Sequence, residues 1–271
     1  MTTEILQAAI AKARAQRDAG KPATAAAVTA EAQPQPSGWD DLEKVSLDTD
    51  RLVKNRILSI ASSRSSTPFD ILRTRILQRM RENGWKRIAI TSPTPRCGKS
   101  TLALNLAFGM SRQPDRQVIS IEADMRRPSH ETLLGLPRRD RSVARFLSGR
   151  EPFSKSAVLA RANLALALNT HSASNASDVI LGSTVEAALA RLTKDYAPDL
   201  MIFDTPPLLA NDDAMAFLTH VDCAMIVAAA GDTTVKEVDQ CERLIAQQTQ
   251  VMGVVLNKAR YGATKEGYEY Y

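Results

Sequence analysis

The pattern of apolar residues from position 87 onward predicts alternating strands and helices. Five short apolar runs lack a regular polar alternation, as strands buried on both faces do. They cover residues 87–91, 117–121, 200–203, 224–228 and 251–256. Helical spacing of apolar residues occupies the segments 100–111, 179–194, 214–219 and 234–248. This alternation predicts an α/β fold, with a mostly parallel sheet and helices on both of its faces.

A further helix is predicted ahead of the first strand. Thr67 is a suitable N-cap, and Pro68 suits the first helical position. Apolar residues follow at helical spacing, at Phe69, Leu72, Ile76, Leu77 and Met80. The pair Asn83-Gly84 marks the end of this helix.

Composition divides the chain into three parts. Residues 1–50 are predicted to be a disordered extension and linker, because an alanine-rich stretch and a proline-containing run follow one short helical segment. Residues 51–260 carry the periodic pattern of a folded domain. Residues 261–271 have too little aliphatic content to pack as a core element, and we expect a flexible tail there.

Hydropathy and cysteine usage indicate a cytoplasmic protein. No apolar run approaches the ~20 residues that span a bilayer, and the first residues lack the features of a signal peptide. The three cysteines, Cys97, Cys223 and Cys241, have no metal-site spacing and suggest no disulfide framework. A reduced compartment fits this pattern.

Positive charge is concentrated in one block. The formal net charge is +5, and residues 51–90 alone hold 10 basic and 2 acidic side chains. A solvated helix face or a contact with an acidic subunit is the favoured interpretation. An anionic membrane surface or a nucleic acid would also attract such a block, although we expect no nucleic-acid partner.

The segment 88–101 has the context of a phosphate-binding loop: an apolar strand, a loop, Gly-Lys-Ser and a helix. Lys99 would contact the β- and γ-phosphates, and the Ser100 hydroxyl would ligate Mg²⁺. Gly98 lets the backbone approach a phosphate closely. The first glycine of the strict pattern is replaced by Pro93. We expect ATP to bind at Pro95, Arg96, Cys97, Gly98, Lys99, Ser100 and Thr101.

Three carboxylates follow predicted strands. Glu122 and Asp124 end the second strand, and Asp204 ends the third. Ligands of open α/β sheets bind at the carboxyl ends of strands, so these acids are expected beside Lys99. Asp204 would hold the Mg²⁺ shell, and Asp124 with Glu122 would ligate metal or accept a proton. The alternatives are a helix cap for Glu122 and a turn anchor for Asp204.

Other polar residues carry weaker signals. Asn257 follows the last strand and would touch adenine or cap a turn. The three histidines have no metal-ligand spacing and are interpreted as structural or surface residues; they are His130, His171 and His220. A basic loop would contact an acidic partner or a phosphotyrosine, with a solvated loop as the favoured alternative; it contains Arg138, Arg139 and Arg141.

Four of the five tyrosines lie in the last eleven residues. They are Tyr261, Tyr268, Tyr270 and Tyr271. A tyrosine cluster on an accessible tail, in a chain with an ATP site, is interpreted as a phosphate acceptor. The alternative is an aromatic anchor that docks on a partner.

Taken together, these motifs resemble the bacterial tyrosine kinases (BY-kinases) of capsular and exopolysaccharide systems. The similarity extends from about residue 67 to 271. The matching pieces are residues 69–74, 95–101, 122–128, 204–207 and 253–258, followed by the tyrosine tail. The partition and division-site ATPases share this P-loop class, but their signature lysine is replaced by Thr94.

The resemblance implies a P-loop NTPase fold with deviant Walker motifs and a Mg-ATP-dependent protein-tyrosine autokinase. It implies a homo-oligomer in which the tail of one subunit is phosphorylated by another. It also implies activation by a membrane-spanning chain-length (co-polymerase) protein, which would hold the cytoplasmic kinase at the inner face of the membrane. Regulation of polysaccharide synthesis and export would be its role.

The chain departs from the family pattern at several positions. Arg96 stands where the family has glycine, and Glu122 stands where it has aspartate. In the helix linked to oligomerisation, Thr67 and Asp70 replace the first two residues of the family motif, and Arg73 matches the third. Two alternatives to a kinase therefore stay open: a non-catalytic ATP-binding scaffold and an ATPase switch.

Overall fold

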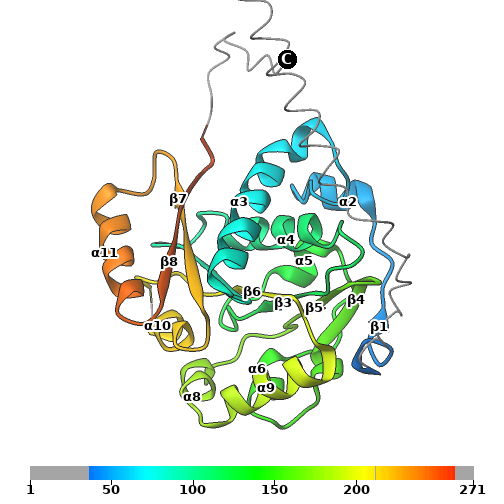
Figure 1. The fold of residues 1–271 in the computed structure, drawn as a ribbon. Helices are drawn as coiled ribbons and strands as arrows, with labels where there is room; N and C mark the ends of the chain where they lie inside the picture. Colours follow the sequence, from blue (N-terminus) through cyan, green and yellow to red (C-terminus); the bar gives the residue numbers. More distant parts are fainter. Residues whose placement is uncertain (1–36, 211, 260–271) are drawn as a thin grey trace, which may run out of the picture. The chain divides into compact units, whose positions relative to one another are not determined.

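A central eight-stranded sheet organises the fold (Figure 1). The structure is a computed structural model that describes residues 37–210 and 212–259. The strand order is β1-β4-β5-β3-β6-β2-β7-β8, and every neighbouring pair is parallel except β4 and β5. The strands are β1 (Glu43–Lys44), β2 (Arg87–Thr91), β3 (Val118–Glu122), β4 (Ala157–Arg161), β5 (Leu164–Ala167), β6 (Leu200–Asp204), β7 (Cys223–Ala229) and β8 (Gln250–Asn257).

All five predicted strands are confirmed, as β2, β3, β6, β7 and β8, with bounds that differ by at most one residue. Strands β1, β4 and β5 were not predicted. The sequence of β4 and β5 is rich in alanine and leucine, which intrinsically favour helix. Pairing of β5 with β3 in the sheet overrides that preference.

Helices cover both faces of the sheet, so the predicted α/β class is confirmed (Figure 1). One face packs against α2 (Thr49–Lys54), α3 (Thr67–Asn83), α4 (Lys99–Met110) and α5 (His130–Leu134). The other packs against α6 (Val143–Leu147), α7 (Phe153–Ser156), α8 (Ala176–Ile180), α9 (Thr184–Tyr196), α10 (Asp213–Leu218) and α11 (Val235–Ala246). None of the helices in the described ranges is long and apolar enough to cross a membrane.

Two helix predictions need correction. The segment 179–194 is not one helix, because α8 ends at Ile180 and α9 begins at Thr184, with Gly182 in the turn between them. In α3, the N-cap is Ser66 rather than Thr67. The Thr67 hydroxyl donates to the carbonyl of Ser63 at 3.3 Å, in the 3₁₀ turn that precedes the helix.

The predicted domain start at residue 51 is also wrong, because the segment 37–50 belongs to the folded unit. A 3₁₀ turn, η1 (Ser37–Trp39), places the Trp39 ring 3% exposed, and its Nε1 donates to the carbonyl of Tyr196 at 2.8 Å. Strand β1 then pairs with β4 at one edge of the sheet. Isolated apolar residues such as Trp39 and Leu42 give no periodic signal, yet each is buried by tertiary contacts. Residues 1–36 and the tail 261–271 lie outside the described residues.

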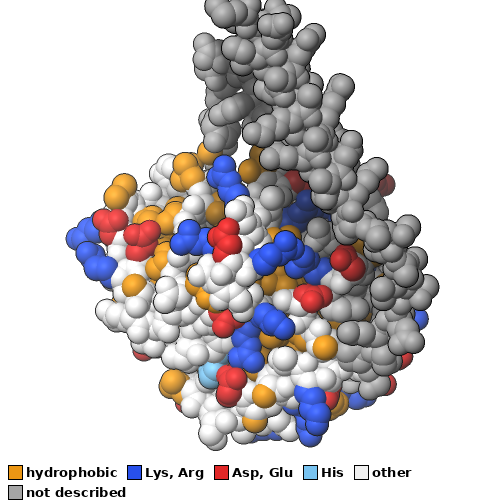
Figure 2. Space-filling view, in the orientation of Figure 1, with side chains coloured by type: hydrophobic (Ala, Val, Ile, Leu, Met, Phe, Trp, Pro, Cys, Tyr) orange, Lys and Arg blue, Asp and Glu red, His pale blue; other side chains and the backbone are white. Residues whose placement is uncertain are grey.

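The basic block fits the solvated-face interpretation where its side chains are described. Arg73 of α3 lies 3.5 Å from Asp70 and donates to the carbonyl of Gly109 at 2.9 Å. Arg87 pairs with Glu186 at 3.2 Å. Basic and acidic side chains are interspersed over the face that Figure 2 shows. Two arginines of the block thus make intramolecular contacts, and most of its other basic side chains are exposed.

Replacing Trp39 by alanine tests whether the segment 37–50 is part of the domain. We expect Trp39→Ala to lower the free energy of unfolding by about 3–5 kcal/mol, because a fully packed ring and its hydrogen bond are lost. Urea unfolding followed by circular dichroism measures this. The exposed neighbour Asp40 provides the control, Asp40→Ala, with an expected change of at most ~0.5 kcal/mol. Equal stabilities of the two variants would contradict the assignment.

Candidate nucleotide site

The phosphate loop connects β2 to α4 at the carboxyl edge of the sheet. Gly98 is the N-cap residue of α4 and has a φ of 92°, a left-handed conformation that favours glycine. The loop directs the amino end of a twelve-residue helix toward the site. Unpaired amide groups and the helix dipole at such an end attract anions. The local geometry thus matches the predicted phosphate site.

Neighbouring segments brace this loop from both sides. The Asn257 side chain, at the end of β8, donates to the carbonyl of Cys97 at 2.8 Å. A Cβ added to Gly98 would collide with the same amide group. On the other side, the amide of Leu209 donates to the carbonyl of Pro93 at 3.1 Å. Asn257, predicted to touch adenine or cap a turn, contacts the phosphate loop in this structure.

Lys99 lies between two carboxylates. Its Nζ is 2.7 Å from Asp124 Oδ2 and 3.5 Å from Asp204 Oδ1, and the residue is 8% exposed. Burial acts to lower the pKa of Lys99, but the charges of Asp204 and Asp124 outweigh it and raise the pKa. Strands β3 and β6 are neighbours, which is why the two aspartates meet here. The structure therefore brings together three of the four predicted catalytic side chains.

Asp204 is completely buried and contacts a histidine that sequence reasoning did not assign to the site. Its Oδ2 lies 3.0 Å from His130 Nε2, at the start of α5. Burial acts to raise the pKa of Asp204, but Lys99 and His130 together hold it below its usual value. His130 was expected to be structural or at the surface. Only the folded chain, in which the start of α5 lies beside the end of β6, reveals this contact.

The Glu122 carboxylate does not contact Lys99, and it binds backbone amides instead. Its Oε1 accepts hydrogen bonds from the amides of Ser129 and His130, at 2.5 and 2.8 Å. Its Oε2 accepts from the amide of Asn169 at 2.9 Å. The helix-cap alternative therefore describes Glu122 better than the predicted proton acceptor, because its carboxylate already receives three backbone donors at the start of α5.

The side chains around Lys99 fit a magnesium ion held jointly with phosphate. Asp204 Oδ1 is buried beside Lys99 Nζ, 3.5 Å away, and the Ser100 hydroxyl also hydrogen-bonds Asp204, so this carboxylate faces the phosphate loop. No group of three or more His, Cys, Asp or Glu side chains suited to a metal ion occurs in the described ranges. Magnesium in nucleotide sites needs no such group, since one or two carboxylates, phosphates and waters suffice. Ser100 and Asp204 are the fitting protein ligands, with Asp124 beside them.

The remaining loop residues differ in exposure. Pro95 and Arg96 are exposed, whereas Cys97 is 1% exposed and its Sγ lies 3.2 Å from the carbonyl of Thr94. Arg96 has a φ of 66°, in the left-handed region that favours glycine. This agrees with the glycine that the family has at this position. Thr101 is in the first turn of α4. The four tail tyrosines lie outside the described residues.

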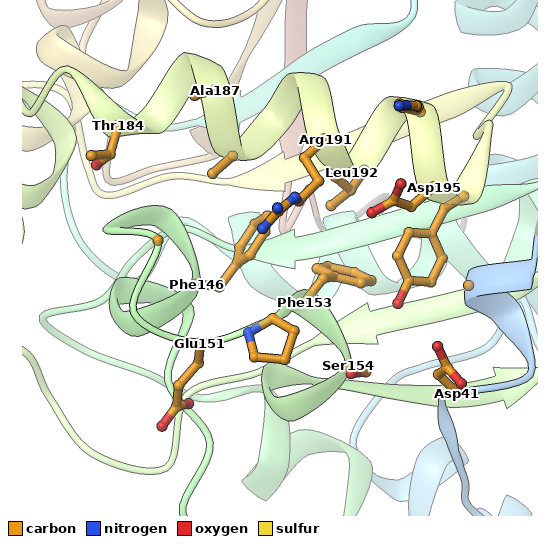
Figure 3. Close-up of a pocket in the computed structure, with 16 residues that line it drawn as sticks. Asp41, Phe146, Glu151, Phe153, Ser154, Thr184, Ala187, Arg191, Leu192 and Asp195 are labelled. Atoms are coloured by element: carbon orange, nitrogen blue, oxygen red, sulfur yellow. The ribbon is translucent and has the colours of Figure 1, made fainter.

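The largest cavity described, about 830 Å³, is at a different place (Figure 3). It lies between α9 and the segment that contains α6 and α7, where Arg191 extends from α9 toward Phe146 and Phe153. None of the predicted site residues lines it. Cavity size alone therefore does not identify the predicted nucleotide site around Lys99.

Comparisons with known proteins agree with this geometry. Residues 85–271 match the ParA family, described as "NUBPL iron-transfer P-loop NTPase". The chain is 28% identical over 208 residues to the putative tyrosine-protein kinase CapB of Staphylococcus aureus, covering 76% of this chain and 90% of the relative. It is 31% identical over 186 residues to the tyrosine-protein kinase wzc of Salmonella typhimurium, covering 68% of this chain but only 25% of that longer relative.

A solved structure extends the likeness to three dimensions. The kinase domain of the Escherichia coli tyrosine kinase ETK superposes with a TM-score of 0.64 and 27% identity, covering 75% of this chain and 80% of the domain. The chain belongs to the bacterial tyrosine kinases, within the ParA class of P-loop NTPases. The predicted family and fold are thereby confirmed, and the expected activity class is that of a protein-tyrosine kinase.

The left-handed backbone at Arg96 is expected to lower the free energy of unfolding of this chain. An L-residue in the left-handed region is less stable than glycine by about 1–2 kcal/mol, partly offset by the greater freedom of glycine in the unfolded chain. We expect Arg96→Gly to be about 1 kcal/mol more stable than Arg96→Ala, which removes the same side chain but keeps the Cβ. Urea unfolding of both variants measures the difference. A more stable alanine variant would rule out strain at this position.

Glu122→Gln tests the structural assignment of Glu122. The substitution places an amide group against backbone donors, so we expect the free energy of unfolding to fall by about 2 kcal/mol or more. The exposed Glu186 gives the matched control, Glu186→Gln, with an expected change of at most ~0.5 kcal/mol. Both variants are made in a Lys99→Met background and compared by urea unfolding, which removes any influence of activity. An unchanged stability in Glu122→Gln would show that its carboxylate is not needed for the fold.

Proposed function

We propose that this chain is a Mg-ATP-dependent tyrosine autokinase that phosphorylates the tail tyrosines of a second copy. The observation that supports the proposal most directly is the convergence of Lys99, Asp124 and Asp204 at the amino end of α4. This arrangement supplies a phosphate-binding ammonium, oxygen ligands and a carboxylate for proton transfer within one site.

Nucleotide would bind across the carboxyl edge of the sheet. The loop amides and Lys99 would contact the phosphates, and Asn257 would keep the loop in shape. A cavity of about 510 Å³ is lined by Ala230, Gly231, Asp232 and Lys258, at the ends of β7 and β8. We assign the adenine end of ATP to this side, so that its phosphates would extend along the phosphate loop toward Lys99. Ser100 and Asp204 would hold Mg²⁺, which would supply positive charge beside the phosphates.

The transfer itself is a direct displacement. The tyrosine oxygen would attack the γ-phosphorus, forming a new P–O bond, while the bond to the β-phosphate oxygen breaks and ADP leaves with the electron pair. Asp124 would take the tyrosine proton. Lys99 would stabilise the charge that develops on the transferred group, since its ammonium is largely buried at the amino end of α4.

The family resemblance supports a role in the regulation of capsule or exopolysaccharide synthesis and export. The partner would be a membrane-spanning chain-length protein, and the kinase would act in the cytoplasm at the inner face of the membrane. A homo-oligomer would bring a tail to a neighbouring site. Within the oligomerisation motif, Asp70 and Arg73 contact groups of their own subunit, including Arg112 and Gly109. The assembly would therefore need contacts beyond that motif.

Lys99→Met is the decisive variant. After incubation with Mg-ATP, we expect the intact mass of the wild-type protein to rise in phosphate steps that map to Tyr261, Tyr268, Tyr270 or Tyr271. Lys99→Met should show at least a 100-fold slower gain, since the ammonium that stabilises the transferred phosphoryl group is lost. Lys194→Met, which removes an exposed lysine on α9, should behave as the wild type.

Mixing two full-length chains then separates transfer between copies from transfer within one. The Lys99→Met chain serves as the acceptor, and an active chain with all four tail tyrosines changed to phenylalanine serves as the kinase. Phosphate on the Lys99→Met chain would establish transfer between copies. Release of free phosphate with unmodified tyrosines would favour the ATPase switch, and nucleotide binding without either product would favour the scaffold.

A further inference from the structure

His130 is a buried polar side chain that none of the functions assigned above uses. It is the first residue of α5 and is completely buried. Its Nε2 lies 3.0 Å from Asp204 Oδ2, whereas its Nδ1 is buried with no hydrogen-bond partner in the part of the chain that the structure describes. The contact with Asp204 is therefore the one hydrogen bond of this ring among those residues.

Packing alone does not explain a histidine at this position. A buried ring nitrogen without a partner is unfavourable, and a phenylalanine ring of similar size would fill the same space without one. An ionised carboxylate can only accept hydrogen bonds, so Nε2 of His130 carries the proton and donates to Asp204. The chain thus places a donor toward Asp204 where an apolar ring would suit the core better.

The backbone of His130 is fixed by contacts that do not involve Asp204. Its amide donates to Glu122 Oε1 at 2.8 Å, which attaches the start of α5 to the end of β3. The next residue, Glu131, is also buried, and its Oε1 accepts from Arg141 Nη1 at 2.8 Å. With α5 held in this way, the His130 ring acts as a fixed donor that sets the orientation of the carboxylate.

The two oxygens of Asp204 have different surroundings. Oδ2 accepts from His130, whereas Oδ1 lies 3.5 Å from Lys99 Nζ. The Ser100 hydroxyl also hydrogen-bonds this carboxylate. Rotation about the bond between Cβ and Cγ of an aspartate is otherwise little restricted. The hydrogen bond from His130 opposes that rotation and keeps Oδ1 beside the phosphate loop.

We propose that His130 is a positioning residue, which orients the Asp204 carboxylate for the magnesium ion that binds with the nucleotide. The inference rests on the proposed function, in which Ser100 and Asp204 hold Mg²⁺. Groups that hydrogen-bond a metal-ligating carboxylate fix its direction, and their loss typically weakens metal binding about 10- to 100-fold. Glu122 supports the same oxygen one step further away, through the backbone of His130.

Magnesium-dependent nucleotide binding tests this assignment. The full-length protein binds a fluorescent, non-hydrolysable ATP analogue, and a titration gives the half-saturating Mg²⁺ concentration. We expect His130→Phe, which keeps a buried ring but removes the donor, to raise that concentration at least 10-fold. Affinity for the analogue in EDTA should change less than 3-fold, because Lys99 and the loop amides remain. The control is His220→Phe, at a partly buried histidine 3.4 Å from Glu186, with an expected change of less than 2-fold.

Two amide variants separate the hydrogen bond from packing. The amide nitrogen of glutamine can take the place of Nε2, whereas that of asparagine is one methylene too short to reach Asp204. We expect His130→Gln to stay within 3-fold of the wild-type Mg²⁺ requirement and His130→Asn to raise it at least 10-fold. Both variants bury the same polar group, so this comparison decides the question even if circular dichroism shows that His130→Phe is unfolded.

A double-mutant cycle gives the sharpest outcome. In an Asp204→Asn background, His130→Phe should change the Mg²⁺ requirement less than 2-fold, because its partner carboxylate is gone. Full additivity, equal Mg²⁺ requirements of His130→Gln and His130→Asn, or an equal loss of binding in EDTA would overturn the proposal. No phosphate is transferred in these measurements. Failure here therefore leaves the autokinase to its own test with Lys99→Met, and failure of that test leaves the role of His130 standing.

Discussion

The pairing of one buried ammonium with two buried carboxylates is the constraint on which the rest of the site depends. Lys99 is almost withdrawn from solvent, and a lone charge in that position would be strongly unfavourable. Asp124 and Asp204 compensate it from two adjacent strands, and the amide of Asp124 donates to the carbonyl of Asp204 at 2.8 Å. The order of the strands therefore fixes the electrostatics of the site.

A second layer of contacts holds these groups in place. His130 contacts Asp204, and Glu122 accepts hydrogen bonds from the backbone where α5 begins. Burial acts to lower the pKa of His130, but Glu122 and Asp204 outweigh it and raise the pKa. Short helix α5 is thus tied to both β3 and β6. Any movement of α5 would disturb Asp204 and, through it, the nucleotide site.

The two departures from the family pattern have different physical meanings. Arg96 keeps the left-handed backbone that glycine would adopt without strain, so the loop geometry persists at an energetic disadvantage. Glu122 is longer than aspartate, and its carboxylate reaches the amides of Ser129 and Asn169. Neither residue displaces Lys99, Asp124 or Asp204 from one another. Both departures therefore leave the geometry of the predicted nucleotide site intact.

The sequence by itself determined five of the eight described strands, the phosphate loop and the family, because these are local patterns. A run of apolar residues, a Gly-Lys-Ser before a helix and an acid after a strand are each visible within a few positions. Such signals also predicted that Lys99, Asp124 and Asp204 would share one edge of the sheet, since parallel strands align their carboxyl ends.

Only the tertiary structure decided the rest. Trp39 is held by a hydrogen bond to Tyr196, and β4 and β5 are held by pairing with other strands. These contacts are long-range, so no local pattern in the sequence predicts them. His130 contacts Asp204, and Glu122 accepts hydrogen bonds from the backbone instead of reaching Lys99. Neither position could be predicted, because the partners lie on segments distant in the sequence. Packing between distant segments, rather than the propensity of single residues, decides such contacts.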